Sequence, residues 1–126
     1  MRRFALSFMA PVCAVLLLPS AALAHPKLVA ASPAAGATVS KPVKLSLTFS
    51  ETLVAPLSGI ELTMTGMPGM ANHQPMPIKG FATKVESKTL SATLPRALPA
   101  GSYGLKWHAV AADQHRIEGS YTFTVR

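Results

Sequence analysis

The sequence predicts one small all-β domain, built as a two-layer antiparallel sandwich or a Greek-key barrel. The first observation behind this prediction is that apolar and polar residues alternate with a period of two in five separate stretches, as in strands with one buried face. The second is that turns rich in Pro and Gly separate these stretches. The third is the length of 126 residues, which leaves room for one core and not for two.

The predicted strands are short, and turns separate them. In the fourth stretch Trp107 falls on the apolar face, whereas Lys106 and His108 fall on the opposite face. With further short segments included, we expect five to seven strands. The alternating stretches are 43–49, 60–64, 90–94, 103–109 and 121–125, and the turns between or before them are 32–36, 41–42, 55–56, 66–77 and 95–101.

The beginning of the chain differs from the rest and predicts a cleaved export signal. An Arg-Arg pair, an almost wholly apolar stretch and a small-residue cleavage motif follow one another at residues 2–3, 4–18 and 22–24. The apolar stretch is shorter than the roughly 20 residues that cross a bilayer, so we do not expect a permanent anchor. We therefore expect residues 1–24 to be a signal peptide and residues 25–126 to be the mature domain of an exported protein.

Charge and cysteine content narrow the possible partners of the mature domain. The chain has 12 Lys and Arg against 5 Asp and Glu, and two arginines lie in the expected signal, so 10 basic residues face 5 acidic ones with a net charge of +5. The lysines are dispersed over the predicted strands, which argues against a nucleic-acid surface. Cys13 is lost with the signal, so a soft metal ligand must be Met and a borderline one must be His.

The expected new N-terminus is a candidate metal ligand. Cleavage after Ala24 would give His25 a free α-amine beside its imidazole, and these two nitrogens can chelate one metal ion. Pro26 has no N–H to supply a third nitrogen, so further ligands must come from elsewhere in the fold. The alternative is that His25 is the first residue of a frayed terminus.

The sequence Asp113-Gln114-His115 follows the stretch that contains Trp107. In an extended segment residues i and i+2 point to the same side, so this spacing predicts that the carboxylate and the imidazole converge. Added to the two nitrogens of His25, they would form a planar set of three nitrogens and one oxygen, which suits Cu(II). The alternative is a loop aspartate that caps a turn beside a surface histidine.

Four methionines and one histidine follow one another at a spacing of three, as Met64, Met67, Met70, His73 and Met76. Pro and Gly residues within the same run exclude a helix. In a polyproline-like or looped conformation this spacing places the thioethers and the imidazole along one edge, and such a soft ligand set suits Cu(I). The alternative is a hydrophobic flap in which Met fills gaps. Met64 continues the preceding strand pattern and is the member best suited to the core.

Together these features resemble the CopC/PcoC family of periplasmic copper-resistance proteins over essentially the whole mature chain. The methionine and histidine run, the Asp-x-His pair and Trp107 all match the family pattern. The other matches are His-Pro-Lys-Leu at 25–28, Ser-Pro-x-x-Gly at 32–36, Leu-x-Phe-Ser-Glu ending in Glu51, and Gly-Ser-Tyr-x-Phe-x-Val at 119–125.

The resemblance implies an immunoglobulin-like Greek-key β-sandwich or barrel with two copper sites at opposite ends. At one end Cu(II) would be bound by His25, Asp113 and His115, with Glu51 as an outer or axial participant. The methionine run, which many family members lack, indicates the type with a second site for Cu(I). The Cu(I) candidates are Met64, Met67, Met70, His73 and Met76. His108 is not part of the family pattern and is not included.

Two sites with opposite preferences for oxidation state indicate a copper carrier and not an enzyme. The resemblance implies that the protein holds copper in the periplasm, without stable membrane insertion, and exchanges it with an inner-membrane copper permease or a multicopper oxidase. One competing hypothesis is a histidine-brace copper monooxygenase, although Asp113 would then occupy the position that oxygen needs. The other is a sandwich used for adhesion or assembly, which binds no metal.

Overall fold

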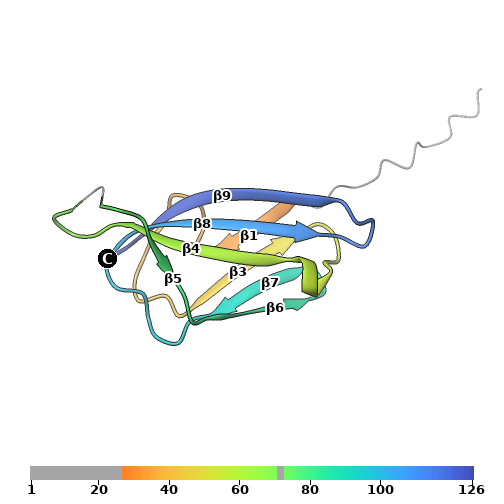
Figure 1. Ribbon diagram of the computed structural model, residues 1–126, viewed down its shortest axis with the longest axis horizontal. Coiled ribbons are helices and arrows are strands. Elements are labelled where there is room, and N and C mark those ends of the chain that lie inside the picture. The colour runs from red at the N-terminus through yellow and green to blue at the C-terminus, as the bar shows by residue number, and fades with distance from the viewer. Residues whose placement is uncertain (1–26, 71–72) are drawn as a thin grey trace, which may run out of the picture.

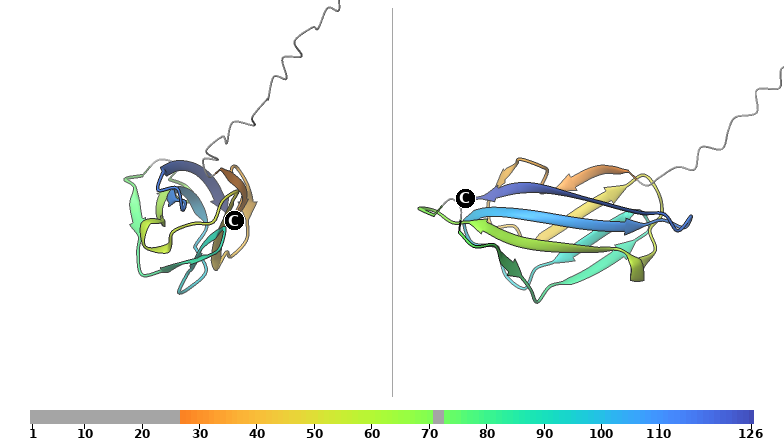
Figure 2. Two further views of the ribbon diagram at one scale, coloured as in Figure 1. Left: turned by 90° about the vertical axis from the view of Figure 1, so that its right-hand side faces the viewer. Right: turned by 45° about the horizontal axis from the view of Figure 1, so that its top comes forward.

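Two β-sheets account for most of the described chain, which comprises residues 27–70 and 73–126 of the computed structural model. Figure 1 and the two views of Figure 2 show the sheets packed as the layers of a sandwich. The one helical element in the described residues is a short 3-10 turn at Ala55–Leu57, and none of their helices has the length and apolarity of a membrane span. The predicted all-β sandwich is therefore confirmed.

The strand order identifies each layer. The four-stranded sheet has the order β1-β3-β7-β6, in which the strands are β1 at Leu28–Ser32, β3 at Lys44–Phe49, β7 at Thr89–Thr93 and β6 at Ala82–Glu86. The five-stranded sheet has the order β2-β9-β8-β4-β5, in which the strands are β2 at Thr38–Val39, β9 at Arg116–Val125, β8 at Gly101–Val110, β4 at Gly59–Gly66 and β5 at Met76–Ile78. The short β2 joins β9 in parallel, whereas the other pairs are antiparallel.

The described residues form nine strands, so the expected five to seven is too few. The strands β2 and β5 have two and three residues, which is too short for alternation to reveal them. The edge strands β1 and β6 carry mostly exposed side chains, and a strand with no buried face lacks the pattern. The strand β9 begins at Arg116 and not at Tyr121, because its first half continues to pair with β8.

Alternating apolar side chains of both sheets form one core. The rings of Phe49 and Trp107 meet edge to face with centroids 5.0 Å apart, and Tyr103 stacks on Phe123 at 5.5 Å. Such aromatic pairs stabilise a core by about 0.5–1.5 kcal/mol beyond the area that they bury. Burial alternates along β8 as the sequence predicts, with Trp107 inside and its two polar neighbours outside.

Two tyrosine hydroxyls tie loops to the sandwich. Tyr103 is fully buried and donates a hydrogen bond of 2.6 Å to the carbonyl of Pro99, which resembles the tyrosine corner of immunoglobulin-like sandwiches. Tyr121 donates a hydrogen bond of 2.9 Å to the carbonyl of Pro33, in the loop after β1. Burial raises the pKa of both phenols, and that of Tyr121 rises to about 12.

The long strands of the five-stranded sheet define two ends of the molecule. At one end β4 leads into residues 66–76, and we name this the hairpin end. At the other end β8 turns into β9 through residues 111–115, and we name this the turn end. Figure 1 shows them on opposite sides of the sandwich. The ten residues of β8 separate them by roughly 30 Å at the usual rise per residue.

Candidate metal sites at the two ends of the sandwich

A carboxylate and an imidazole meet at the turn end. The Oδ2 atom of Asp113 lies 3.1 Å from Nδ1 of His115, and Oδ1 accepts a hydrogen bond of 3.1 Å from the backbone N–H of His115. The predicted convergence of these two groups is therefore observed. A metal ion at this end would meet an imidazole nitrogen and a carboxylate oxygen supplied by a single turn.

The backbone reason for this convergence differs from the extended segment that we expect from the sequence. Gln114 has a φ of 67°, in the left-handed region, and its N–H donates a hydrogen bond of 2.8 Å to the carbonyl of Ala111. Residues 111–114 therefore form a tight turn, and the side chain of Asp113 closes an overlapping Asx turn over residues 113–115. The side-chain hydrogen bond of Asp113, and not strand alternation, orients the two groups.

The start of the described chain and Glu51 lie at the same end. The backbone N–H of Lys27 donates to Oγ of Ser50 at 2.9 Å, and the N–H of Ser50 returns a bond of 2.9 Å to the carbonyl of Lys27. Glu51 follows at once and is half-buried. Leu53 then forms a bridge with Ala111, at the start of the turn. His25 lies outside the described residues, so its placement is not described.

The hairpin end carries two methionines on a small hairpin of its own. Met67 and Met70 exchange two backbone hydrogen bonds of 2.9 Å each, across a turn made by Pro68 and Gly69. Gly69 has a φ of 83°, which a residue with a Cβ adopts at a cost. Side chains of directly opposed residues lie on one face of such a pair. Met67 and Met70 are 36% and 56% exposed, and residues 67–70 form what we name the Met hairpin.

The remaining two methionines face each other across β4 and β5. Met64 and Met76 are register partners, so their side chains lie on the same side of the sheet. Their exposure differs because β5 is an edge strand: Met76 is 49% exposed, whereas Met64 is 6% exposed and belongs to the core cluster. Met64 therefore lies where the strand pattern predicts it, with its Cε close to Gly101.

His73 has one ring nitrogen without a partner among the described residues. Its Nδ1 atom lies 2.7 Å from the carbonyl of Gln74, and since a carbonyl oxygen can accept but not donate, Nδ1 carries the proton. The Nε2 atom is buried and has no hydrogen-bond partner in the described part of the chain. The lone pair of Nε2 is therefore a candidate metal ligand at this end.

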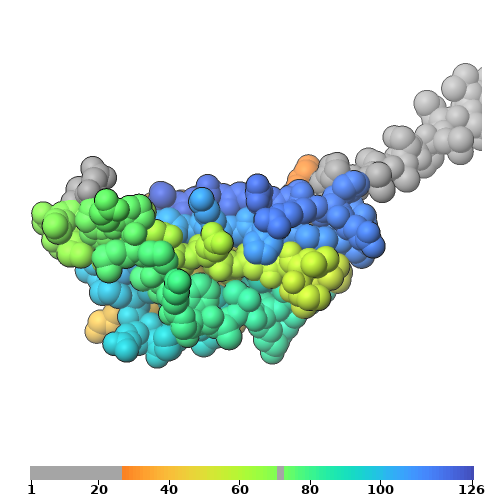
Figure 3. Space-filling view, viewed as in Figure 1, coloured from red at the N-terminus to blue at the C-terminus, as the bar shows by residue number. Residues whose placement is uncertain are grey.

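A hollow separates the Met hairpin from the end of the five-stranded sheet. Its volume is about 380 Å³, and its lining includes residues 67–70 on one side and Gly101 and Val125 on the other. Figure 3 shows the hairpin end projecting beyond the body of the sandwich. This hollow has no local sequence signal, because residues far apart in the chain form its two walls.

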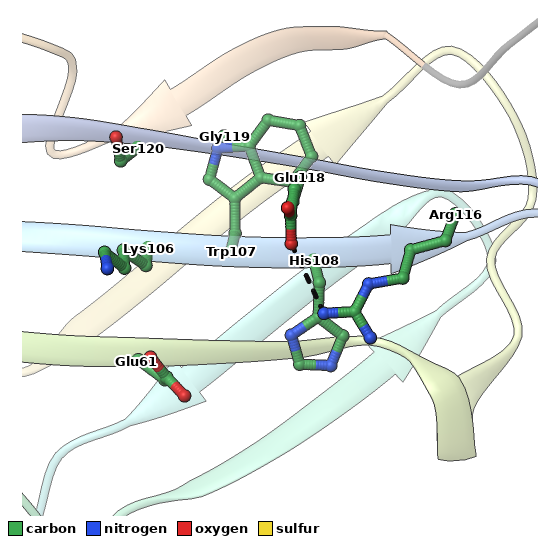
Figure 4. A pocket seen from close by; sticks show the side chains of 8 residues that line it. All are labelled: Glu61, Lys106, Trp107, His108, Arg116, Glu118, Gly119 and Ser120. Carbon is green, nitrogen blue, oxygen red and sulfur yellow. Dashed lines mark hydrogen bonds and ion pairs between the residues drawn. The ribbon is translucent and has the colours of Figure 1, made fainter.

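A further group of polar side chains lies on the outer face of the five-stranded sheet (Figure 4). His108 and Glu118 are cross-strand partners, and Arg116 donates a hydrogen bond of 3.3 Å to Glu118 beside a hollow of about 350 Å³. The imidazole of His108 lies over Gly59, whose missing Cβ would meet it at 2.8 Å. Within residues 27–70 and 73–126 no three His, Cys, Asp or Glu side chains form a group that could hold a metal ion. We assign no metal site to this face.

The fold and its two ends define a small immunoglobulin-like β-sandwich with nitrogen and oxygen groups at one end and thioethers at the other. Comparison with known proteins then places it in a family. Residues 28–126 match the family model of the CopC domain. The chain therefore belongs to the CopC family, and the resemblance read from its sequence is confirmed.

Individual relatives agree with this assignment. The chain is 45% identical over 106 residues to copper resistance protein C of Escherichia coli, covering 83% of this chain and 84% of the relative. It is 44% identical over 121 residues to copper resistance protein C of Pseudomonas syringae pv. tomato, covering 95% of each chain. The crystal structure of PcoC, a methionine-rich copper resistance protein from Escherichia coli, has a TM-score of 0.72 and 43% identity, covering 82% of this chain and 100% of that one. The crystal structure of CopC from Methylosinus trichosporium OB3b has a TM-score of 0.65 and 29% identity, covering 80% of this chain and 93% of that one.

Proposed function

We propose that this protein is a periplasmic copper carrier that binds Cu(II) at the turn end and Cu(I) at the hairpin end. The observation that carries the proposal is the separation of ligand types, with imidazole and carboxylate at one end and thioethers at the other. Nitrogen and oxygen ligands suit Cu(II), whereas thioethers suit Cu(I). Copper as the metal is supported by relatives named for copper resistance.

At the turn end, the proposed Cu(II) ligands are His25, Asp113 and His115. His25 would supply its amine and imidazole after cleavage of residues 1–24, and only Pro26 separates it from Lys27, so the two Cα atoms lie within about 7 Å of each other. Lys27 is hydrogen-bonded to Ser50, the residue before Glu51, and we include Glu51 in the proposal as an outer or axial participant. Removing residues 1–24 is part of this proposal, because without cleavage the chelating amine is an amide.

At the hairpin end, the proposed Cu(I) ligands are Met67, Met70, His73 and Met76, with Met64 as a further candidate. The partly exposed methionines are open to exchange, and Nε2 of His73, which has no hydrogen-bond partner among the described residues, offers a lone pair from the same segment of the chain. Thioethers are weak donors, so a set of them can hold Cu(I) and release it by stepwise exchange. Such exchange fits transfer to a membrane permease or a multicopper oxidase.

The experiment is copper titration of the protein that begins at His25. We expect one tightly bound Cu(II), with an electron paramagnetic resonance spectrum of three nitrogens and one oxygen, and one Cu(I) held against a chelator in the same sample. Stability should rise with each metal as RT ln(1 + [L]/Kd), since the metal binds the folded chain. Absence of tight Cu(II) binding would remove the basis of the proposal, and absence of Cu(I) binding would remove its second site.

The competing oxygenase hypothesis makes a different prediction. If Asp113 binds the copper ion together with His115, its carboxylate occupies the in-plane position that oxygen would need, and the two groups lie 3.1 Å apart. We therefore propose binding and transfer, and not catalysis. Release of oxidised oligosaccharides from chitin or cellulose, with copper and a reductant present, would decide for the enzyme.

A further inference from the structure

The positive charge of residues 25–126 is concentrated around the hairpin end. Five exposed basic side chains lie in the loops and strand ends of this half, and we name them the basic rim: Lys41, Lys44, Lys79, Arg96 and Arg126. All five acidic side chains lie outside it, at Glu51, Glu61, Glu86, Asp113 and Glu118. These acids are matched in number by the remaining five basic residues, so the rim carries the whole net charge of +5.

Backbone hydrogen bonds fix the loops that carry three of the rim residues, Lys41, Arg96 and Arg126, at the hairpin end. The loop that carries Arg96 is tied to the turn after β2 by a hydrogen bond of 3.2 Å from Leu98 N–H to the carbonyl of Pro42. Lys41 lies in that turn, and Arg126 donates its backbone N–H at 3.0 Å to a carbonyl of β2. Figure 1 shows the C-terminus next to the hairpin end. The charges are therefore presented by fixed loops and not by a tail.

Nearby acids do not neutralise the rim. None of the ion pairs among the described residues includes a rim side chain. Lys84 binds the carboxylate of Glu86 at 2.6 Å and is the main cause of the lowered pKa of Glu86. Lys44, a rim residue, lowers the same pKa to a smaller extent. An unpaired cluster of one sign produces a field that attracts an oppositely charged partner and accelerates encounter.

We propose that the hairpin end docks on an acidic protein segment that carries its own methionines and exchanges Cu(I) with this chain. The proposal rests on the Cu(I) site proposed above. The rim supplies attraction to acidic groups, and the exposed Met67 and Met70 lie where incoming thioethers can reach a shared ion. The hollow of about 380 Å³ beside the Met hairpin favours a projecting protein segment over a flat anionic bilayer, which has nothing to place in it.

The test uses a synthetic peptide of methionines flanked by aspartates, and a twin with asparagine in place of each aspartate. Transfer of Cu(I) from the loaded protein to each peptide is followed at low ionic strength and at about 0.15 M salt. We expect transfer to the acidic peptide to be about tenfold faster at low ionic strength, and most of this advantage to vanish with salt. Vesicles of phosphatidylglycerol serve as the bilayer probe, and they should bind the protein more weakly than the acidic peptide does.

Paired charge reversals locate the effect. Arg96→Glu with Arg126→Glu should abolish the preference for the acidic peptide and leave Cu(I) affinity unchanged. The matched control, Lys88→Glu with Lys106→Glu, makes the same change in net charge away from the rim and should retain the preference. Equal rates with the two peptides, equal losses in both variants, or tighter binding to the vesicles would overturn the docking proposal. Failure of the wild type to bind Cu(I) would instead remove the second site of the proposed function, on which this docking proposal rests.

Discussion

The two ends of the sandwich present their candidate ligands in contrasting ways. At the turn end, one Asx turn holds Asp113 and His115 at 3.1 Å, so backbone geometry sets the position of both groups. At the hairpin end, Met67 and Met70 are carried on a hairpin that projects from the body, with their thioethers partly exposed. Fixed nitrogen and oxygen ligands suit an ion with strict geometry, whereas exposed thioethers suit an ion that is passed on.

The largest effect is expected from one extra residue before His25. Extension converts the chelating amine to an amide, so Cu(II) affinity should fall by roughly 1,000-fold, well beyond the 10 to 100-fold effect of an outer partner. Competition with a Cu(II) chelator measures the change. Cu(I) affinity should stay the same, because the hairpin end is roughly 30 Å away. Equal losses of Cu(II) affinity and Cu(I) affinity would contradict the assignment of one copper ion to each end.

Replacing His115 by Ala tests the turn end directly. We expect about a 100-fold loss of Cu(II) affinity, since a direct ligand should matter at least as much as an outer partner. His108→Ala is the matched control, because it removes another imidazole from the same sheet without touching the turn. The spectrum of bound Cu(II) should lose one nitrogen in the first variant and none in the control. Equal effects of the two changes would show that the turn has no special role.

Replacing Met67, Met70 and Met76 together by Leu tests the hairpin end. Cu(I) affinity should fall by about 100-fold, with Cu(II) binding unchanged, since Leu keeps the volume but lacks the thioether. Met64→Leu is the informative comparison, because Met64 is 6% exposed in the core. If Met64 serves the core alone, the Met64→Leu variant keeps the wild-type Cu(I) affinity. A loss of Cu(I) affinity in this variant would instead identify Met64 as a ligand.

The smallest expected effect is a loss of folding stability at alkaline pH. This effect should not distinguish the two ends. Burial raises the pKa of Tyr121 to about 12, so the neutral phenol is favoured in the folded chain. Its contribution to stability is complete below the usual value near 10 and is lost as pH rises toward 12. Urea unfolding between pH 9 and pH 12 should show this decline, and Tyr121→Phe should flatten it. A decline of the same size in that variant would mean that other groups cause it.

Much of the sandwich can be predicted from local patterns. The alternation around Leu45, Leu62, Leu90, Trp107 and Phe123 predicts five of the nine strands, because a strand with one buried face repeats every two residues. The edge strands escape prediction for the same reason, since an exposed strand needs no apolar face. The sequence predicts an extended segment at Asp113 where the structure has a turn, because a local pattern does not reveal that Gln114 adopts a positive φ.

The candidate ligands themselves are visible in the sequence, but no local pattern shows which of them lie together in the fold. Short spacings determine that Asp113 can contact His115 and that Met67 can pair with Met70, because neighbours in the chain cannot separate far. The family resemblance implies that these pairs lie at opposite ends, whereas only the tertiary structure shows that Nε2 of His73 is buried without a partner in the described chain and that Arg96 and Arg126 join one basic rim. Those features depend on pairing between distant strands, which burial of the whole core selects and no local pattern encodes.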